Sequence, residues 1–276
     1  MLDHLVHLDD VPLENQDKEK GWTISQFRLP ITGKDGSSSA LFHGLFQPGS
    51  EHSMHLHDLS DELCIYIRGE GLVGAGDDRL RIGPGCARLM PRTVPHFFHN
   101  ASVGEPAEVF GIYVGAGDVA ATGYGFCGKP TEADLARAEA HTDEPLHYPV
   151  VKVDDVSPDA TDIGWRDTDF RPLLATSNTP EAFCFAATVA PGGSRAQHTL
   201  SGVDTYYLVH EGSALAGDGT AQAELRAGHV LWVPAGTSSW LRNVDPVRPL
   251  RLFGYHVGAA TPAAMGYRFE REAPAV

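Results

Sequence analysis

Three histidines and one glutamate in the first third of the chain have the types and the spacing of a metal-binding set. His55 and His57 are two residues apart, so on a β-strand both side chains point to the same face. Glu62 follows one short turn later, and His96 belongs to a strand-like run, 86–98. In a sheet that curls on itself, the four groups can converge. Three imidazoles and one carboxylate suit Fe(II), Mn(II), Co(II), Ni(II) or Zn(II), with one or two positions left for water or substrate.

These four residues lie within two longer motifs. Residues 49–69 match G-x5-H-x-H-x4-E-x6-G, and residues 85–100 match G-x5-P-x4-H-x3-N. The chain therefore resembles the cupin superfamily, and the resemblance implies that the four residues bind one divalent metal ion. A pair of histidines can arise by chance among 14, but these also keep register with the Gly, Pro and Asn positions of the family. Thr93 departs from the pattern, because Gly usually serves a tight turn there; we expect this to affect the turn rather than the ligands.

Short apolar runs separated by Gly, Pro and Asp predict many β-strands in the same part of the chain. They are expected at 40–47, 62–68, 71–75, 79–82, 86–90, 96–100 and 107–114. Strands this short and this closely spaced indicate a sandwich or barrel of jelly-roll type. The cupin resemblance selects the barrel.

The composition changes after residue 115. Residues 116–147 are rich in Ala, Gly and Pro, and they read as a linker. Within it, 130–140 contains good helix formers, and Thr131 is a plausible cap with Asp134 three residues further on. We therefore expect one short helix in this linker.

From residue 148 the sequence repeats the first half with a shift of 143. The matching positions include Gly21-Trp22 with Gly164-Trp165, Gly49 with Gly192, Gly69 with Gly212, Gly85 with Gly228, Pro91 with Pro234, and Asn100 with Asn243. Because turn and packing positions recur, the second half is expected to form a second barrel. The sequence thus predicts an all-β bicupin: two tandem cupin (jelly-roll β-barrel) domains, 1–115 with the metal site and 148–276, joined by the linker 116–147.

The same shift predicts that the second barrel has lost its metal. His55 falls on His198, but the other three ligand positions are occupied by Leu200, Thr205 and Ser239. One ligand of four cannot hold a divalent ion tightly. We expect this domain to be structural, with a small-molecule site inside its apolar barrel as the alternative.

Side chains in phase with the ligands are predicted to line a substrate pocket. Cys64 and Tyr66 share a face with Glu62, and Phe98 shares a face with His96. Tyr66 is a catalytic candidate because a buried phenol needs a polar partner, and Glu62 is a candidate base. The strand before the motif presents one of two alternating faces, either Phe42 and Gly44 or His43 and Leu45, and the pattern leaves this open. His52 and His99 lie just outside the ligand set, with no catalytic role assigned.

The resemblance implies a metal-dependent enzyme that acts on a small oxygenated organic molecule. Cupins with this ligand set include dioxygenases that cleave electron-rich C–C bonds, and they also include non-redox isomerases, cyclases and lyases of secondary or carbohydrate metabolism. The spacing is common to both groups. We favour a dioxygenase with Fe(II), keep the non-redox enzymes as the alternative, and rank a non-catalytic small-molecule binding protein third.

Composition bounds the partners and the location. The formal charge of −15 over 276 residues opposes binding to nucleic acid. No apolar run approaches the roughly 18 residues that a membrane span needs, and no secretory signal is visible, so a cytoplasmic location is expected. The four cysteines show no C-x-x-C pair, which suits reduced thiols. The resemblance further implies a homodimer.

Overall fold

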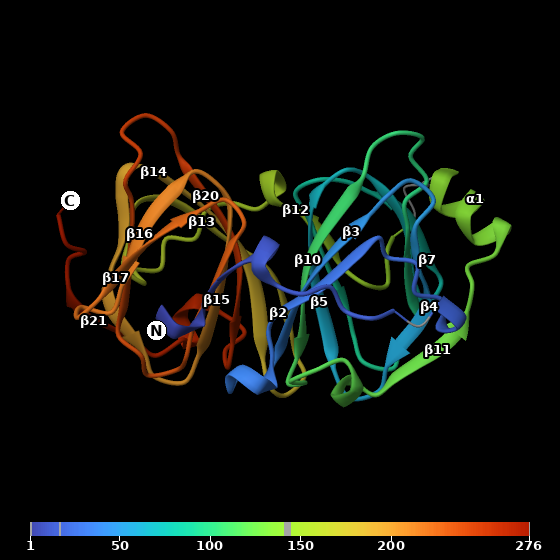
Figure 1. Ribbon diagram of the computed structural model, residues 1–276, viewed down its shortest axis with the longest axis horizontal. Helices are drawn as coiled ribbons and strands as arrows, with labels where there is room; N and C mark the ends of the chain where they lie inside the picture. The colour runs from blue at the N-terminus through green and yellow to red at the C-terminus, as the bar shows by residue number, and fades with distance from the viewer. Residues whose placement is uncertain (1, 17, 141–144, 276) are drawn as a thin grey trace. The chain divides into compact units, whose positions relative to one another are not determined.

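The computed structural model describes residues 2–16, 18–140 and 145–275 (Figure 1). Its contacts divide the chain into two compact units. One comprises Pro12–Lys152, and the other comprises Met1–Val11 together with Val153–Val276. Almost all of the regular structure is antiparallel β-sheet, and the predicted all-β fold is confirmed.

The first unit consists of two antiparallel sheets. The six-stranded sheet has the order β12-β8-β5-β10-β3-β2, and the five-stranded sheet has the order β11-β4-β9-β6-β7. The strands are β2 (Gln26–Ile31), β3 (Ala40–Phe46), β4 (Glu51–His57), β5 (Asp61–Arg68), β6 (Gly71–Ala75), β7 (Asp78–Ile82), β8 (Cys86–Met90), β9 (His96–His99), β10 (Ala107–Val114), β11 (Tyr124–Gly128) and β12 (Val150–Lys152). The seven strands predicted between residues 40 and 114 are confirmed, each to within one residue at either end.

The single α-helix in the described part of the chain packs on the first unit. Helix α1 (Glu132–Ala140) contacts β6 and β7, and Arg79 forms a 2.8 Å ion pair with Asp134. The predicted cap is confirmed, because the Asp134 amide donates to Thr131 Oγ1 at 3.1 Å and the Thr131 amide donates to Asp134 Oδ2 at 2.8 Å. No helix in the described ranges is long and apolar enough to cross a membrane.

The second unit is also built of antiparallel strands. They are β13 (Trp165–Thr176), β14 (Ala182–Leu200), β15 (Asp204–Glu211), β16 (Ser213–Gly217), β17 (Gln222–Arg226), β18 (His229–Val233), β19 (Ser239–Asn243), β20 (Leu250–Val257) and β21 (Tyr267–Arg271). The order is β1-β18-β15-β20-β14-β19-β16-β17, and β13 and β21 pair with the 19-residue β14. The sequence did not predict that β1 (Leu5–His7) would pair with β18, more than 220 residues away.

The internal repeat is confirmed by contacts that recur at matching positions. Asn100 Nδ2 donates to the carbonyls of Phe46 and Glu105, and its Oδ1 accepts from a backbone amide two residues on. Asn243 makes the equivalent contacts one repeat later, with Val189, Arg248 and Asp245. The same asparagine therefore closes the same loop in each barrel, because its amide satisfies backbone groups that the strands leave unpaired.

The turn at Thr93, where the family pattern has glycine, adopts the left-handed backbone conformation that glycine favours. Thr93 has φ 67°, and its amide donates to the His57 carbonyl at 2.8 Å. The turn therefore survives the substitution, and the threonine takes the left-handed conformation that a β-branched residue disfavours.

We expect Thr93→Gly to stabilise the protein. Relief of the left-handed strain is worth about 1–3 kcal/mol, and the added flexibility of glycine costs about 0.5–1 kcal/mol, so the net gain is about 1 kcal/mol. Thr93→Ala keeps a Cβ but lacks the branch, so it should gain less. Urea unfolding of the three proteins measures both differences. A loss of stability in Thr93→Gly would mean that the threonine side chain makes a stabilising contact.

Candidate metal centre

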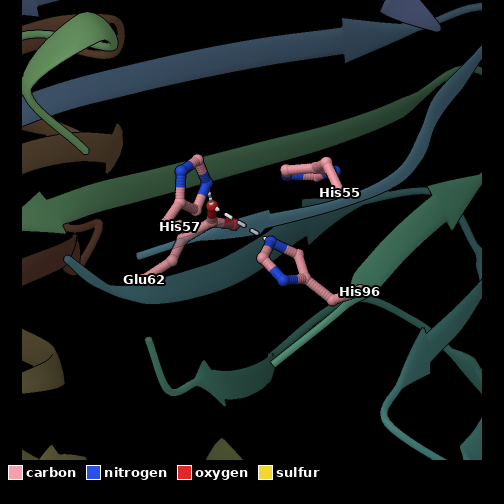
Figure 2. A group of neighbouring side chains, drawn as sticks. All are labelled: His55, His57, Glu62 and His96. Carbon is pink, nitrogen blue, oxygen red and sulfur yellow. Dashed lines mark hydrogen bonds and ion pairs between the residues drawn. The ribbon is translucent and has the colours of Figure 1, made fainter. Parts of the chain in front are cut away.

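The structure brings the four predicted ligands together at one buried point. His55 and His57 lie on β4, Glu62 lies on β5, and His96 lies on β9, where it is the register partner of His55 (Figure 2). One ligand atom from each side chain lies within 4.8 Å of the others, and all four residues are buried. Ligand atoms on opposite sides of a divalent ion are roughly 4.2 Å apart, so a small inward movement would complete such a site.

Backbone carbonyls orient two of the three imidazoles. His55 Nδ1 lies 2.7 Å from the carbonyl of Ser53, and His96 Nδ1 lies 2.9 Å from the carbonyl of Val94. A carbonyl only accepts, so each Nδ1 carries the proton and donates it. The Nε2 atom of each ring is then left with a free lone pair, which is the form that binds a metal.

A threonine hydroxyl orients the third imidazole in the same sense. Thr122 Oγ1 donates to the carbonyl of Val119 at 2.7 Å, so it accepts from His57 Nδ1 at 2.8 Å. His57 Nε2 therefore also presents a lone pair toward the centre. Because each ring's tautomer follows from the partner of its other nitrogen, the three histidines are set for the same task.

The charges at this point suit a cation. Burial lowers the pKa of His55 and of His57, so both rings are neutral. Burial alone would raise the pKa of Glu62, and hydrogen bonds from the facing His57 and His96 rings would hold it well below its usual range. In the tautomers described above these rings have no Nε2 proton to donate, so a bound cation is what would keep Glu62 a carboxylate.

The lone pairs face one another without a proton to share. His57 Nε2 and His96 Nε2 lie 3.0 Å and 3.5 Å from Glu62 Oε2 (Figure 2). Within the described residues, neither His55 Nε2 nor His96 Nε2 has a hydrogen-bond partner. Four electron-pair donors that converge in a buried space repel one another unless a cation lies between them. The donor set therefore fits a divalent metal ion, as the sequence predicts.

The centre forms part of the wall of a small internal cavity. The cavity has a volume of about 30 Å³, and His55, Glu62 and His96 line it. The three predicted pocket residues, Cys64, Tyr66 and Phe98, also line it. Strand β3 contributes Phe42 and Gly44, which settles the question of its inward face that the sequence left open. The structure thus places all the predicted site residues, except His57, along one cavity.

Comparison with known proteins agrees with this fold. Residues 42–113 match the family model of the cupin domain, and no curated protein sequence matches the chain. A single-residue variant of oxalate decarboxylase from Bacillus subtilis has a TM-score of 0.68 at 16% identity, over 93% of this chain and 77% of its own. Vicilin from tomato, Solanum lycopersicum, has a TM-score of 0.70 at 14% identity, over 93% of this chain and 85% of its own. Residues 42–113 thus form a cupin domain, and the chain shares its fold with these two proteins.

A buried arginine that the sequence did not single out lies beside the four candidate ligands. Arg88 lies opposite Cys64 in the β5–β8 register, is 2% exposed, and lines the cavity. It hydrogen bonds to the Tyr66 phenol, whose pKa is raised chiefly by burial. Its Nη2 has no hydrogen-bond partner in the described part of the chain. The signal in the sequence was an arginine in the middle of an otherwise apolar strand.

Two further aromatic neighbours of the ligands were not assigned from the sequence. The His52 ring stacks on His55 with centroids 3.6 Å apart, and burial lowers the pKa of His52 to about 3. Tyr124, on β11, stacks on His55 at 5.3 Å. The sequence places His52 just outside the ligand set, because residues three apart on a regular strand face opposite sides, and the β-bulge between His52 and His55 brings the two rings together. Tyr124 and Thr122 belong to the stretch whose composition reads as a linker.

In the second barrel, the described residues at the matching positions do not form an equivalent group. His198 keeps the tether of its counterpart, with Nδ1 2.7 Å from the Ala196 carbonyl. The other positions carry Leu200, Thr205 and Ser239, none of which replaces an imidazole or a carboxylate as a ligand. Among the described residues, the four side chains of the first barrel are the only such group that could hold a metal ion.

We expect His96→Ala to lose its metal while keeping its fold. Loss of a group that only hydrogen-bonds to a metal ligand lowers metal affinity by about 10–100-fold, so loss of a ligand itself should lower the affinity further. Elemental analysis of the purified protein, with circular dichroism as the check on folding, measures both. His198→Ala is the matched control and should retain the wild-type metal content. Equal metal content in all three proteins would contradict this site.

We expect Thr122→Val to weaken metal binding without abolishing it. The valine removes the acceptor that holds His57 Nδ1–H, so the ring loses its orientation, and the affinity should fall by about 10–100-fold. Competition with a chelator of known affinity measures the change. Thr122→Ser keeps the hydroxyl and should bind as the wild type does; the same loss in both variants would mean that the hydroxyl plays no part.

Proposed function

We propose that this protein is a metal-dependent enzyme that acts on a small oxygenated organic molecule. The observation that carries the proposal is the convergence of three Nε2 lone pairs and one carboxylate beside a small cavity, which would have to widen to admit such a molecule. When bound, a divalent metal would act as a Lewis acid toward an oxygen atom of the substrate. We favour Fe(II), with Mn, Ni, Co or Zn as alternatives; Mn(II) centres occur in the structurally similar oxalate decarboxylase.

The residues around the centre favour an acidic substrate. The unpartnered Nη2 of Arg88 can pair with a carboxylate or an enolate, and such charge-assisted contacts are strong in a buried site. The Tyr66 phenol stays protonated, because burial raises its pKa, so it donates a hydrogen bond and does not serve as a base. Phe42 and Phe98 form part of the apolar wall of the cavity.

Glu62 is the group we propose as the base. It is the one carboxylate that lines the cavity in the described structure, and a bound cation would keep it ionised. Its Oε1 accepts from the Cys64 thiol at 3.1 Å, while Oε2 faces His57 and His96. A proton taken from the substrate would therefore reside on Glu62.

Two reaction classes fit these residues. We place a dioxygenase first, because a set of three histidines and one carboxylate suits a redox-active ion. The second candidate is a non-redox lyase, isomerase or cyclase, and it is favoured by Arg88, which suits a carboxylate, and by the likeness of the fold to that of a decarboxylase. In either case the substrate is a small molecule, and the homodimer that the resemblance implies stays a prediction.

The two classes are distinguished by oxygen uptake. Protein purified without added metal or chelator would be analysed for its metal and assayed against catechols, flavonols, 1,3-diketones and small dicarboxylic acids. Oxygen consumption that stops after chelation and returns with Fe(II) supports the dioxygenase. Product formation without oxygen supports the second class. A protein that purifies without metal and binds none on addition would contradict the proposal.

For whichever substrate is found, we expect Arg88→Met to lower kcat/KM. A hydrogen bond to a charged group is worth about 1.5–3 kcal/mol, which corresponds to a fall of roughly 10–150-fold. The metal content should not change, because Arg88 is not a ligand. Arg81→Met, which removes an exposed arginine paired with Glu70, is the control. An equal effect of Arg88→Met on an acid substrate and on its methyl ester would show that Arg88 does not bind the acid group.

A further inference from the structure

A buried arginine in the second barrel has no acidic partner. Arg195 lies on β14 and is 1% exposed. Its Nε donates to the Ile163 carbonyl at 3.3 Å, its Nη1 donates to the Tyr207 hydroxyl, and the guanidinium lies 5.0 Å from the centroid of the Trp165 ring. Nη2 has no hydrogen-bond partner, and no carboxylate of the described residues pairs with the side chain. A buried cation without a counter-charge is costly, so this arrangement calls for an anion.

The arginine lines a small cavity. The cavity has a volume of about 10 Å³, and His198, Tyr207 and Ser239 also line it. Tyr207 accepts from Arg195, so its own hydroxyl proton is available to a ligand, and the Ser239 hydroxyl can donate as well. The remaining wall is largely apolar, formed by side chains such as Leu231. Apart from His198, each polar side chain that lines this space is therefore a cation or can donate a hydrogen bond.

The histidines near this cavity add no charge to that of Arg195. Burial lowers the pKa of His198 to about 3, and burial also holds the pKa of His256 well below its usual value, with the nearby Arg195 acting in the same direction on both. Both rings are neutral, and His256 Nε2 has no hydrogen-bond partner among the described residues. The charge of Arg195 is thus uncompensated by either ring.

Comparison of matching positions in the repeat shows that the interior side chains of the two barrels differ in charge. With the shift of 143, Arg195 takes the position of His52, and Thr205 takes that of Glu62; Tyr207 and Ser239 replace Cys64 and His96. Trp165 likewise replaces Trp22, which packs against His52 with ring centroids 4.6 Å apart. The first barrel presents lone pairs and a carboxylate to its centre, whereas the second presents a guanidinium and hydroxyl groups.

We propose that the second barrel binds one small anion of halide size through Arg195, Tyr207 and Ser239. A volume of about 10 Å³ holds roughly one water-sized sphere, so the carbon chain of an organic acid does not fit, whereas a chloride or bromide ion, slightly larger than water, needs only a small outward movement of the lining side chains. The bound ion would link β14, β15 and β19, the strands that carry these three residues. It is thus a structural site, separate from the metal centre.

Bromide tests the proposal directly. In crystals grown in bromide, we expect an anomalous peak within hydrogen-bond distance of Arg195 Nη2. In solution, Tm should be higher in chloride than in gluconate at equal ionic strength, by about 3–5 °C for each tenfold excess of chloride over its Kd. Arg195→Met should lose both effects. Arg251→Met, which removes an exposed arginine paired with Glu211, should keep both.

The wild-type protein alone can overturn the proposal. If the crystals show no bromide beside Arg195, or if Tm is the same in chloride and gluconate, Arg195 is a structural arginine held by Trp165 and Tyr207 only. This result stands even if Arg195→Met fails to fold. Density for a larger anion at the same place would also count against a halide site, because it would show that the cavity opens to admit an organic acid.

Discussion

The metal centre depends on how the outer nitrogen of each histidine is held. Ser53, Val94 and Thr122 each offer an oxygen that can only accept from Nδ1, and this forces all three lone pairs inward. Two of these oxygens are backbone carbonyls in β4 or next to β9, so strand geometry itself determines the tautomer. A barrel that positions such carbonyls can bind metal wherever the right side chains occur, and the surrounding sheet is the support for that geometry.

The two barrels show how one scaffold can serve opposite charges. Both keep the tethered histidine, His55 or His198, and both keep a tryptophan beside the position three residues earlier. Changing that position from histidine to arginine, together with the loss of the carboxylate, reverses the preference of the interior. The loop-closing asparagines and turn glycines are untouched by this change, because they stabilise the backbone and take no part in the chemistry.

The sequence predicted the site best where the residues involved lie close together along the chain. His55, His57 and Glu62 lie within eight residues, and the strands around them alternate clearly, so ligands and strands could be predicted together. Thr122 and Tyr124 could not, because they reach the site from a stretch rich in Ala and Gly that shows no strand period. Arg88 was hidden for a different reason: a charged residue in an apolar strand shows its role only when its neighbours in space are known.

The pairing of β1 with β18 affects the order in which the chain can fold. Leu5 and His7 are made early in synthesis, but their partners Leu231 and His229 follow more than 220 residues later. Every strand of the first barrel is complete by Lys152, so that barrel can close while the ribosome is still translating the second. The edge of β1 must meanwhile remain unpaired, which makes it the part of the chain most exposed to wrong strand pairing during synthesis.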